Sequence, residues 1–449
     1  MSISHKRDIL YSIGLSLNIL GVIVGNFIRS IFKIELVNII MALSLLLIVN
    51  YKNIYNLRFP SLNKNMILLL ISQVIIIIYY GFNTYSSPIA QSIHLFYSII
   101  LIICFSSLNT QNLFKHFFPT FYILSSITVV LAFYIFSNGF QNISFGTAQI
   151  EVLKQAEIEG RSMIFLYPTA ALYHTMITLI LYPKINNLSR FLGTVMLILL
   201  IADFILVLSS GKRTVVLIFF TYILYYLWNK GYLSKYKQIP KYILIICLLY
   251  ILINYLFIQF AFLQEYLESF QRRITNGIET LIGYKNKNTD ESAYTRVILR
   301  NWAMDIYNTQ FTWKNHIIGY GYMTKYLDQP ILQCMFDMGL IGIFVYIYNA
   351  ILFPLYFLCK KEKYNNYILF AKMLCINTII TCFTAGTPYG YQLYFPTLLL
   401  IYMLQLKQKL KTKPNFIYKG NQYINLNISS TYKKIIRRQS NNALQKQSH

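Results

Sequence analysis

Apolar residues fill blocks of about twenty positions along most of the chain, and short polar clusters separate these blocks. An α-helix needs about twenty apolar residues to cross roughly 30 Å of hydrocarbon. Twelve blocks of this kind lie near residues 9–28, 36–50, 66–81, 89–106, 119–137, 163–182, 191–209, 214–228, 242–262, 331–358, 365–385 and 391–405. The pattern predicts an all-α, polytopic integral membrane protein with about 12 transmembrane helices.

The blocks also divide the chain into regions, because two of the segments between them are longer than the rest. We expect nine spans in residues 1–262, with a small outer loop at 138–162. A large helical extracytoplasmic loop follows at 263–330, then three more spans at 331–405 and a basic cytoplasmic tail at 406–449 that we expect to be disordered. No internal repeat is visible, and this asymmetry counts against an inverted-repeat transporter.

Basic residues are distributed unevenly between the two sides of this predicted arrangement. The chain is 56% hydrophobic and 12% charged, with a formal charge of +25. If the N-terminus is cytoplasmic, the short loops on that side hold 15 basic residues and those opposite hold six, and the tail adds ten more inside. This is the positive-inside pattern, which places both termini in the cytoplasm. The charge is therefore topological, and no nucleic-acid partner is expected.

Two helices are predicted in the large loop. The first carries an apolar stripe at steps of three and four residues and would lie along the membrane surface; the stripe consists of Leu263, Leu267, Phe270, Ile274, Ile278 and Leu281. The second begins near Thr289 and carries Tyr294, Ile298 and Trp302 on one face. Arg296 and Arg300, four residues apart, share the neighbouring face.

Basic side chains recur at the outer face, at Arg161, at Lys212 with Arg213, at Arg296 with Arg300, and more weakly at Arg272 with Arg273. A guanidinium group pairs two phosphate oxygens at once, so these clusters suit a phosphorylated ligand. Arginines at helix ends also reach for lipid headgroups without binding any substrate. Both interpretations stay open for each position.

Other polar residues give weaker signals. The six histidines have no metal-ligand spacing, so we expect no metal and no cofactor. His174, inside a span, is expected to be a hydrogen-bonded packing residue. Asp203 is the acid deepest in a span, and Lys212 or Arg213 is its expected partner in a structural pair.

Four short stretches, taken together, resemble the Wzy-type O-antigen and capsular polysaccharide polymerase family, which is related to the O-antigen ligases. They are "RSMIFLYPTAALYH" from Arg161, "SSGKRTVVL" from Ser209, "TRVILRNW" from Thr295 with the later "IIGYGY", and "DQPILQCMFDMGLIG" from Asp328. The resemblance extends to the span layout and the single large outer loop. Where the ligases and some polymerases have a His-Asn pair before the last stretch, this chain has Asp328 and Gln329.

The resemblance implies a metal-independent glycosyltransferase-type enzyme of the bacterial cytoplasmic (inner) membrane. Its substrate would be an oligosaccharide linked to polyprenyl pyrophosphate, and membrane lipids and a chain-length regulator protein would be further partners. The expected catalytic residues are Arg161, Arg213 and Asp328, and the expected substrate-binding residues are Lys212, Arg296, Arg300, Gly319, Gly321 and Asp337. Two alternatives remain, a ligase of the same superfamily and a lipid-linked oligosaccharide flippase or other transporter.

Overall fold

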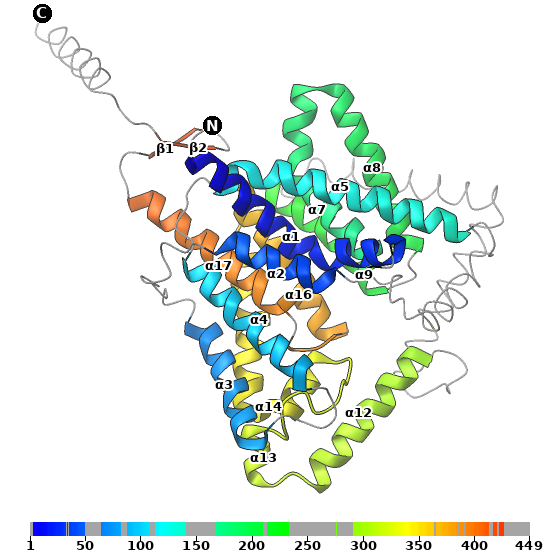
Figure 1. Cartoon of the computed structure of the whole chain (residues 1–449), viewed down its shortest axis with the longest axis vertical. Helices are drawn as coiled ribbons and strands as arrows, with labels where there is room; N and C mark the ends of the chain where they lie inside the picture. Colours follow the sequence, from blue (N-terminus) through cyan, green and yellow to red (C-terminus); the bar gives the residue numbers. More distant parts are fainter. Residues whose placement is uncertain are drawn as a thin grey trace, which may run out of the picture.

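A computed structural model describes residues 3–32, 34, 36–49, 64–81, 88–107, 113–140, 167–209, 213–232, 275, 291–362, 365–384, 386–389, 391–412, 416–419 and 422–425. This part of the chain is largely helical (Figure 1). The helices are α1 (Ile3–Phe32), α2 (Val37–Ile48), α3 (Lys64–Tyr80), α4 (Pro88–Ser107), α5 (Leu113–Phe140), α7 (Tyr167–Leu188), α8 (Arg190–Ser209), α9 (Arg213–Lys230), α12 (Glu291–Thr309), α13 (Trp313–Ile318), α14 (Pro330–Ile347), the π-helix η5 (Tyr348–Leu352), α15 (Phe353–Leu358), α16 (Asn366–Thr384) and α17 (Tyr391–Thr412).

Each expected span coincides with one of these helices, apart from two. The span 331–358 covers α14, η5 and α15 in succession, and the span 242–262 lies outside the described residues. Within the described part, five helical stretches are long and apolar enough to cross a membrane: Arg7–Arg29, His116–Tyr134, Arg190–Leu208, Pro330–Leu358 and Asn366–Thr384. Several further apolar helices are shorter. The structure thus agrees with a helical membrane protein, while the total of about 12 spans stays a prediction.

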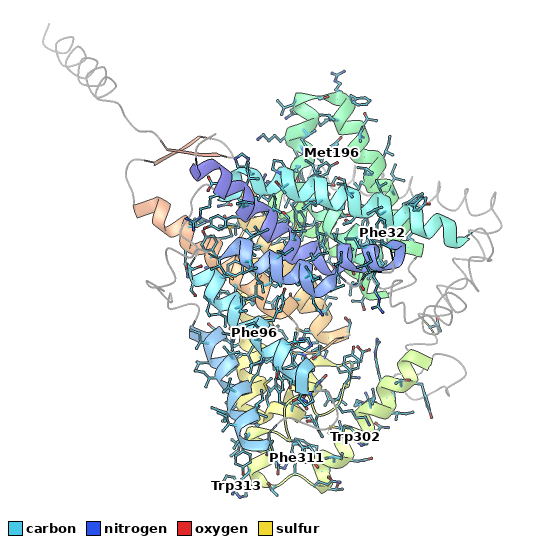
Figure 2. The ribbon with its side chains drawn as sticks, in the orientation of Figure 1. Phe32, Phe96, Met196, Trp302, Phe311 and Trp313 are labelled. Carbon is cyan, nitrogen blue, oxygen red and sulfur yellow. The ribbon has the colours of Figure 1, made fainter. Side chains whose placement is uncertain are left out.

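Large apolar side chains on the outside of the bundle are consistent with contact to lipid. Ile78 is 78% exposed, Phe191 75% and Phe344 70%. Phe32 and Phe96 are exposed as well and are labelled in Figure 2. Exposed apolar surface on this scale is unusual for a protein surrounded by water.

Close approach between neighbouring helices depends on small residues in α1. A Cβ atom added at Gly14 would lie 2.7 Å from the Leu47 Cβ, and one at Gly25 would lie 2.8 Å from the Val37 Cα. Because the earlier glycine meets the later residue of α2, the two helices run antiparallel (Figure 1). Small residues at an interface let membrane helices pack backbone against backbone, which is the main attraction between them in lipid.

Successive spans cross the membrane in opposite directions, which predicts the side on which each loop lies. At one end of the bundle, contacts join loops that are all predicted to lie on the extracytoplasmic side. The Tyr80 hydroxyl, at the end of α3, donates to the Gly319 carbonyl at 2.7 Å. The backbone N–H of Gly386, between α16 and α17, donates to the Asp328 carboxylate at 2.9 Å. The loop after α13 is thus fixed to the end of α3 and to the turn between α16 and α17.

At the opposite end of α16, contacts join segments that are predicted to lie inside. The Lys230 ammonium, at the end of α9, donates to the Asn366 side-chain oxygen at 2.9 Å. Lys407 of α17 forms an ion pair of 2.7 Å with Glu362, in the turn between α15 and α16. The loops that meet at each end of the bundle are therefore those that are predicted to share one side of the membrane.

Two predicted regions differ in detail or are only partly described. In the large loop, the first expected helix lies outside the described residues except for Thr275. The second, α12, buries Ala303 and packs Trp302 on Phe336 of α14, with 5.5 Å between the rings, whereas Ile298 is 49% exposed. The predicted tail contains the last turns of α17 and two paired antiparallel strands, β1 (Phe416–Lys419) and β2 (Gln422–Asn425).

Candidate functional site

The helix α14 is interrupted, and the loop after α13 fills the interruption. Gly339 has φ +63° and ψ −163°, which breaks the helical path. The carbonyls of Phe336 and Asp337 would normally bond to the N–H groups four residues later. Here they accept from the backbone N–H groups of Tyr320, at 2.9 Å, and Gly321, at 3.3 Å. The loop therefore satisfies the backbone groups that the break releases.

Gly319 and Gly321 were expected to contact substrate, but here they let the loop after α13 pack against α14. Both have positive φ, +103° and +141°. A Cβ atom at Gly319 would lie 2.1 Å from the Asp337 carbonyl oxygen, and one at Gly339 would lie 2.5 Å from the Ile317 carbonyl oxygen. The missing side chains let the protein's own backbone approach, and Gly319 is buried beneath that contact.

Asp328, expected to be catalytic, lies just before α14 and accepts three hydrogen bonds. Its Oδ2 bonds to Arg296 Nε of α12 at 2.7 Å. Its Oδ1 accepts from the Tyr326 hydroxyl at 2.7 Å and from the Gly386 N–H at 2.9 Å. The Asp328 side chain is 21% exposed. With three donors on its two oxygens, the carboxylate is held in one orientation, as suits a residue that fixes Arg296.

Two features of the surrounding loop support this geometry. Asp328 has φ +53°, a left-handed conformation that aspartate tolerates better than most residues. Desolvation of the Tyr326 hydroxyl, together with its bond to Asp328, raises the pKa of Tyr326. The hydroxyl therefore keeps its proton and remains a donor to the carboxylate.

Arg296 uses Nε for this pair, and its side chain is 31% exposed. Within the described part, its two terminal amino groups have no hydrogen-bond partner. A guanidinium group held through Nε presents those amino groups as a fixed fork, which suits phosphate oxygens. Arg300, one turn further along α12, is exposed.

Asp337, expected to contact substrate, is instead fully buried. Its Oδ2 accepts from the Tyr389 hydroxyl at 2.7 Å and from the Gln333 amide at 3.3 Å. Its Oδ1 accepts from the Thr324 N–H at 3.4 Å. Asp337 thus ties the loop after α13 to the segment before α17, beneath the Asp328 site.

Other expected site residues are not placed by the structure. Arg161 and Lys212 lie outside the described residues. Arg213 is the first residue of α9, and its side chain is not described. Conversely, sequence reasoning missed Gly386 and Tyr389. The stretch "GTPYGY" from Gly386 was a signal for them, since it is a glycine- and proline-containing turn between two outer span ends.

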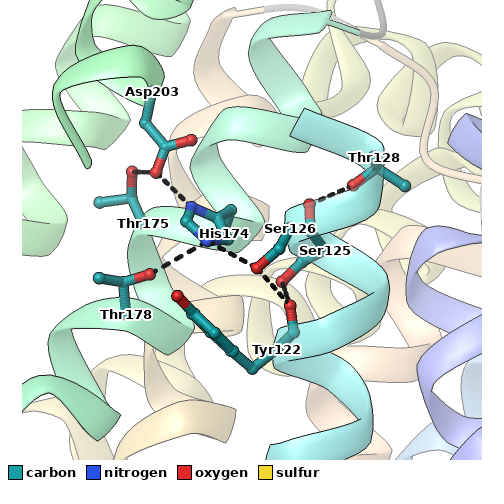
Figure 3. Close-up of polar contacts among 8 residues, drawn as sticks. All are labelled: Tyr122, Ser125, Ser126, Thr128, His174, Thr175, Thr178 and Asp203. Atoms are coloured by element: carbon teal, nitrogen blue, oxygen red, sulfur yellow. Dashed lines mark hydrogen bonds and ion pairs between the residues drawn. The ribbon is translucent and has the colours of Figure 1, made fainter. Parts of the chain in front are cut away.

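A second polar group is buried between α5, α7 and α8 (Figure 3). His174 Nδ1 lies 2.6 Å from Asp203 Oδ2, which also accepts from the Thr175 hydroxyl at 3.1 Å. His174 Nε2 lies 3.2 Å from the Ser126 hydroxyl and 3.4 Å from that of Thr178. His174 is thus a hydrogen-bonded packing residue, as expected. The partner of Asp203 is His174 instead of Lys212 or Arg213.

Ser126, His174 and Asp203 share the bonding order of a hydrolase triad, but their surroundings do not suit that chemistry. His174 and Asp203 are fully buried. The Ser126 hydroxyl lies 2.8 Å from the carbonyl of Tyr122 on its own helix. All three side chains project from helix interiors, where backbone N–H groups are already paired and cannot form an oxyanion hole. The group is better explained as a polar contact that holds three helices together.

Within the described residues, no group of three or more His, Cys, Asp or Glu side chains gathers in a way that could hold a metal ion. Comparisons of the chain with protein-family models, curated proteins and solved structures find no match.

Proposed function

We propose that the protein is a membrane polysaccharide polymerase that joins oligosaccharide repeat units carried on polyprenyl pyrophosphate. The observation that carries the proposal is the Arg296–Asp328 pair, which holds a partly exposed guanidinium fork at the end of a bundle of apolar helices. In a lipid-linked substrate, the pyrophosphate would lie at the end of the bundle beside Arg296, and the polyprenyl tail would lie along the apolar helices. The outer face of a bacterial cytoplasmic membrane and a role in O-antigen or capsule synthesis belong to the proposal.

The reaction needs charge stabilisation more than it needs a cofactor. A sugar hydroxyl of the acceptor unit attacks the anomeric carbon of the donor, and its proton passes to an oxygen of the departing pyrophosphate or to water. The bond between that carbon and the pyrophosphate oxygen breaks, and polyprenyl pyrophosphate leaves with the electron pair. We assign Arg296 to the departing pyrophosphate. Asp328, which was expected to be catalytic, is proposed to orient Arg296, and Arg161 and Arg213 remain proposed cationic partners.

The test is elongation of lipid-linked repeat units by the purified full-length protein. Arg296→Ala removes a donor to the leaving group, so we expect chain elongation to fall about 100-fold. Asp328→Asn keeps the Arg296 guanidinium group but weakens the bond that orients it, so we expect chain elongation to fall by less, about 10-fold. Asp305→Asn is the matched control, because Asp305 is exposed on the same helix.

Normal elongation by a folded Arg296→Ala protein would overturn the assignment. The rival functions give different products. A ligase defect accumulates long lipid-linked polymer, whereas a polymerase defect accumulates single units.

A transporter of lipid-linked oligosaccharides is a second candidate, favoured by the interrupted helix α14. Broken helices beside buried acids are common in transporters. Here the freed carbonyls of Phe336 and Asp337 are occupied by the loop after α13 instead of lining a cavity, which weakens the comparison. Elongation of repeat units by the purified protein in detergent, where no gradient exists, would exclude a purely transporting role.

A further inference from the structure

Lysine side chains gather at the end of the bundle opposite the Asp328 site. We call them the lysine cluster: Lys230 at the end of α9, Lys360 and Lys361 after α15, Lys372 in α16 and Lys407 in α17. In the described part, Glu362 is the acid bonded within this group. The α9 helix ends at Lys230, directly before Gly231 at φ +80°, and the Lys230 ammonium reaches the side chain of Asn366 at the start of α16.

Specific hydrogen bonds hold the cluster together. The backbone N–H of Glu362 donates to the Asn229 side-chain oxygen at 3.1 Å. Lys407 Nζ lies 2.7 Å and 2.9 Å from the two carboxylate oxygens of Glu362. Lys230 Nζ donates to Asn366 at 2.9 Å. Four elements therefore contribute to one fixed arrangement of positive charge.

Positive charge exceeds negative charge within this arrangement. Lys372 is fully buried, and within the described residues its ammonium group has one hydrogen-bond acceptor, the Lys360 carbonyl, at 2.5 Å. An ammonium group has three N–H bonds, so this acceptor leaves part of its capacity unused. Glu362 is already bonded to Lys407. A buried ammonium beside other ammonium groups is costly unless an anion offsets it.

Aromatic rings place the cluster at the depth of lipid headgroups. The Lys361 ammonium lies 5.3 Å from the centre of the Trp228 ring, and that of Lys360 lies 3.8 Å from the centre of the Tyr356 ring. Tyr356 is 60% exposed on an apolar helix. Tryptophan and tyrosine are enriched where a helix leaves the hydrocarbon, and phosphate groups of lipids lie at the same level.

We propose that the lysine cluster binds the phosphate group of an anionic phospholipid. The acyl chains lie along the exposed apolar surface of α15, and the phosphate oxygens accept from Lys360 and Lys361, both exposed. The negative charge offsets the buried Lys372. This site is separate from the proposed polymerase site and does not depend on it.

The test is a titration of the full-length protein in detergent with fluorescent phosphatidylglycerol, compared with fluorescent phosphatidylcholine. Phosphatidylglycerol is expected to bind at least about 10-fold more tightly. The double variant Lys360→Gln with Lys361→Gln removes two exposed charges without disturbing the core, and it is expected to lower the affinity about 30-fold. Lys314→Gln, an exposed lysine near the Asp328 end, is the matched control and should change nothing.

Three outcomes would overturn the proposal. The first is equal binding of the two lipids, and the second is binding that the double variant leaves unchanged. The third is displacement of phosphatidylglycerol by millimolar inorganic phosphate or pyrophosphate, which would make a soluble anion the ligand. Retained binding in the presence of these anions supports the lipid.

Discussion

Asp328 and Asp337 show how surroundings separate two residues of the same type. Asp328 is 21% exposed and holds Arg296, whose two terminal amino groups have no hydrogen-bond partner among the described residues. Asp337 is fully buried, and two of its three described bonds, from Tyr389 and Thr324, join α14 to other segments, while the third comes from Gln333 one turn earlier in the same helix. We therefore expect substitution of Asp328 to change activity more than stability, and substitution of Asp337 to do the reverse.

The buried pair of His174 and Asp203 leads to a prediction about stability. Asp203→Leu leaves the His174 ring nitrogen buried without its partner, at a cost of about 1–3 kcal/mol in unfolding free energy. His174→Phe has a similar cost, because it removes one of the two described partners of the buried Asp203 carboxylate and leaves only the Thr175 hydroxyl. The double variant has no stranded group, so its loss should be smaller than the sum of the two single losses. Denaturant titration in mixed micelles measures all three.

Strictly additive losses would contradict this prediction, since coupled neighbours are expected to deviate by about 0.5–3 kcal/mol. Thr175→Val is a milder companion variant. It removes the 3.1 Å bond to Asp203 and leaves the His174 contact in place.

At the scale of elements, the loop after α13 and the interrupted helix α14 form one packed unit. Gly319 lies against the backbone of Asp337, and Gly339 lies against the backbone of Ile317 and Gly319. Tyr320 and Gly321 bond to the carbonyls that the interruption frees. A further irregularity follows in the same helix at η5, where the Asn349 amide donates to the Val345 carbonyl at 2.8 Å. Irregular backbone at membrane depth persists only where protein groups satisfy it.

Gly319→Ala should therefore destabilise the protein by more than the usual cost of placing alanine at a positive φ. The new methyl group would collide with the Asp337 carbonyl, and we expect a loss of roughly 3 kcal/mol, measured by thermal unfolding in detergent. Gly231→Ala is the matched control. Gly231 also has positive φ, but a Cβ there meets nothing within 4 Å, so its loss should be about 1 kcal/mol. Equal losses for both variants would show that the close approach does not matter.

At the scale of the whole molecule, hydropathy predicted where helices occur but not which side chains meet. The length of an apolar segment and the spacing of its apolar residues indicate that it is a helix. The partner of Asp203, by contrast, depends on how α7 packs against α8, and hydropathy carries no such information. Similarly, the positive-inside count predicted which lysines share a side, but not that Lys372 would be buried among them. Gly319 was expected to contact a substrate, whereas its close contact is with the backbone of Asp337.

The loops at the two ends of the helix bundle are predicted to face opposite sides of the membrane. Among the described cysteines, Cys359 is the exposed one, and it lies beside the lysine cluster. In a background with the other cysteines replaced, a membrane-impermeant maleimide should label Cys359 only after cells are permeabilised. In a parallel chain lacking Cys359, Lys314→Cys should be labelled in intact cells. Labelling of both positions from one side would contradict the predicted alternation.

The interruption at Gly339 also bears on how the protein is made. A continuous helix satisfies its own backbone as it leaves the insertion machinery, but α14 leaves the carbonyls of Phe336 and Asp337 dependent on Tyr320 and Gly321. Each such group left unpaired in hydrocarbon costs several kcal/mol. The partner segment precedes α14 in the chain, so it is already synthesised when the helix enters the bilayer. We therefore expect integration of this helix to depend on docking of the loop after α13.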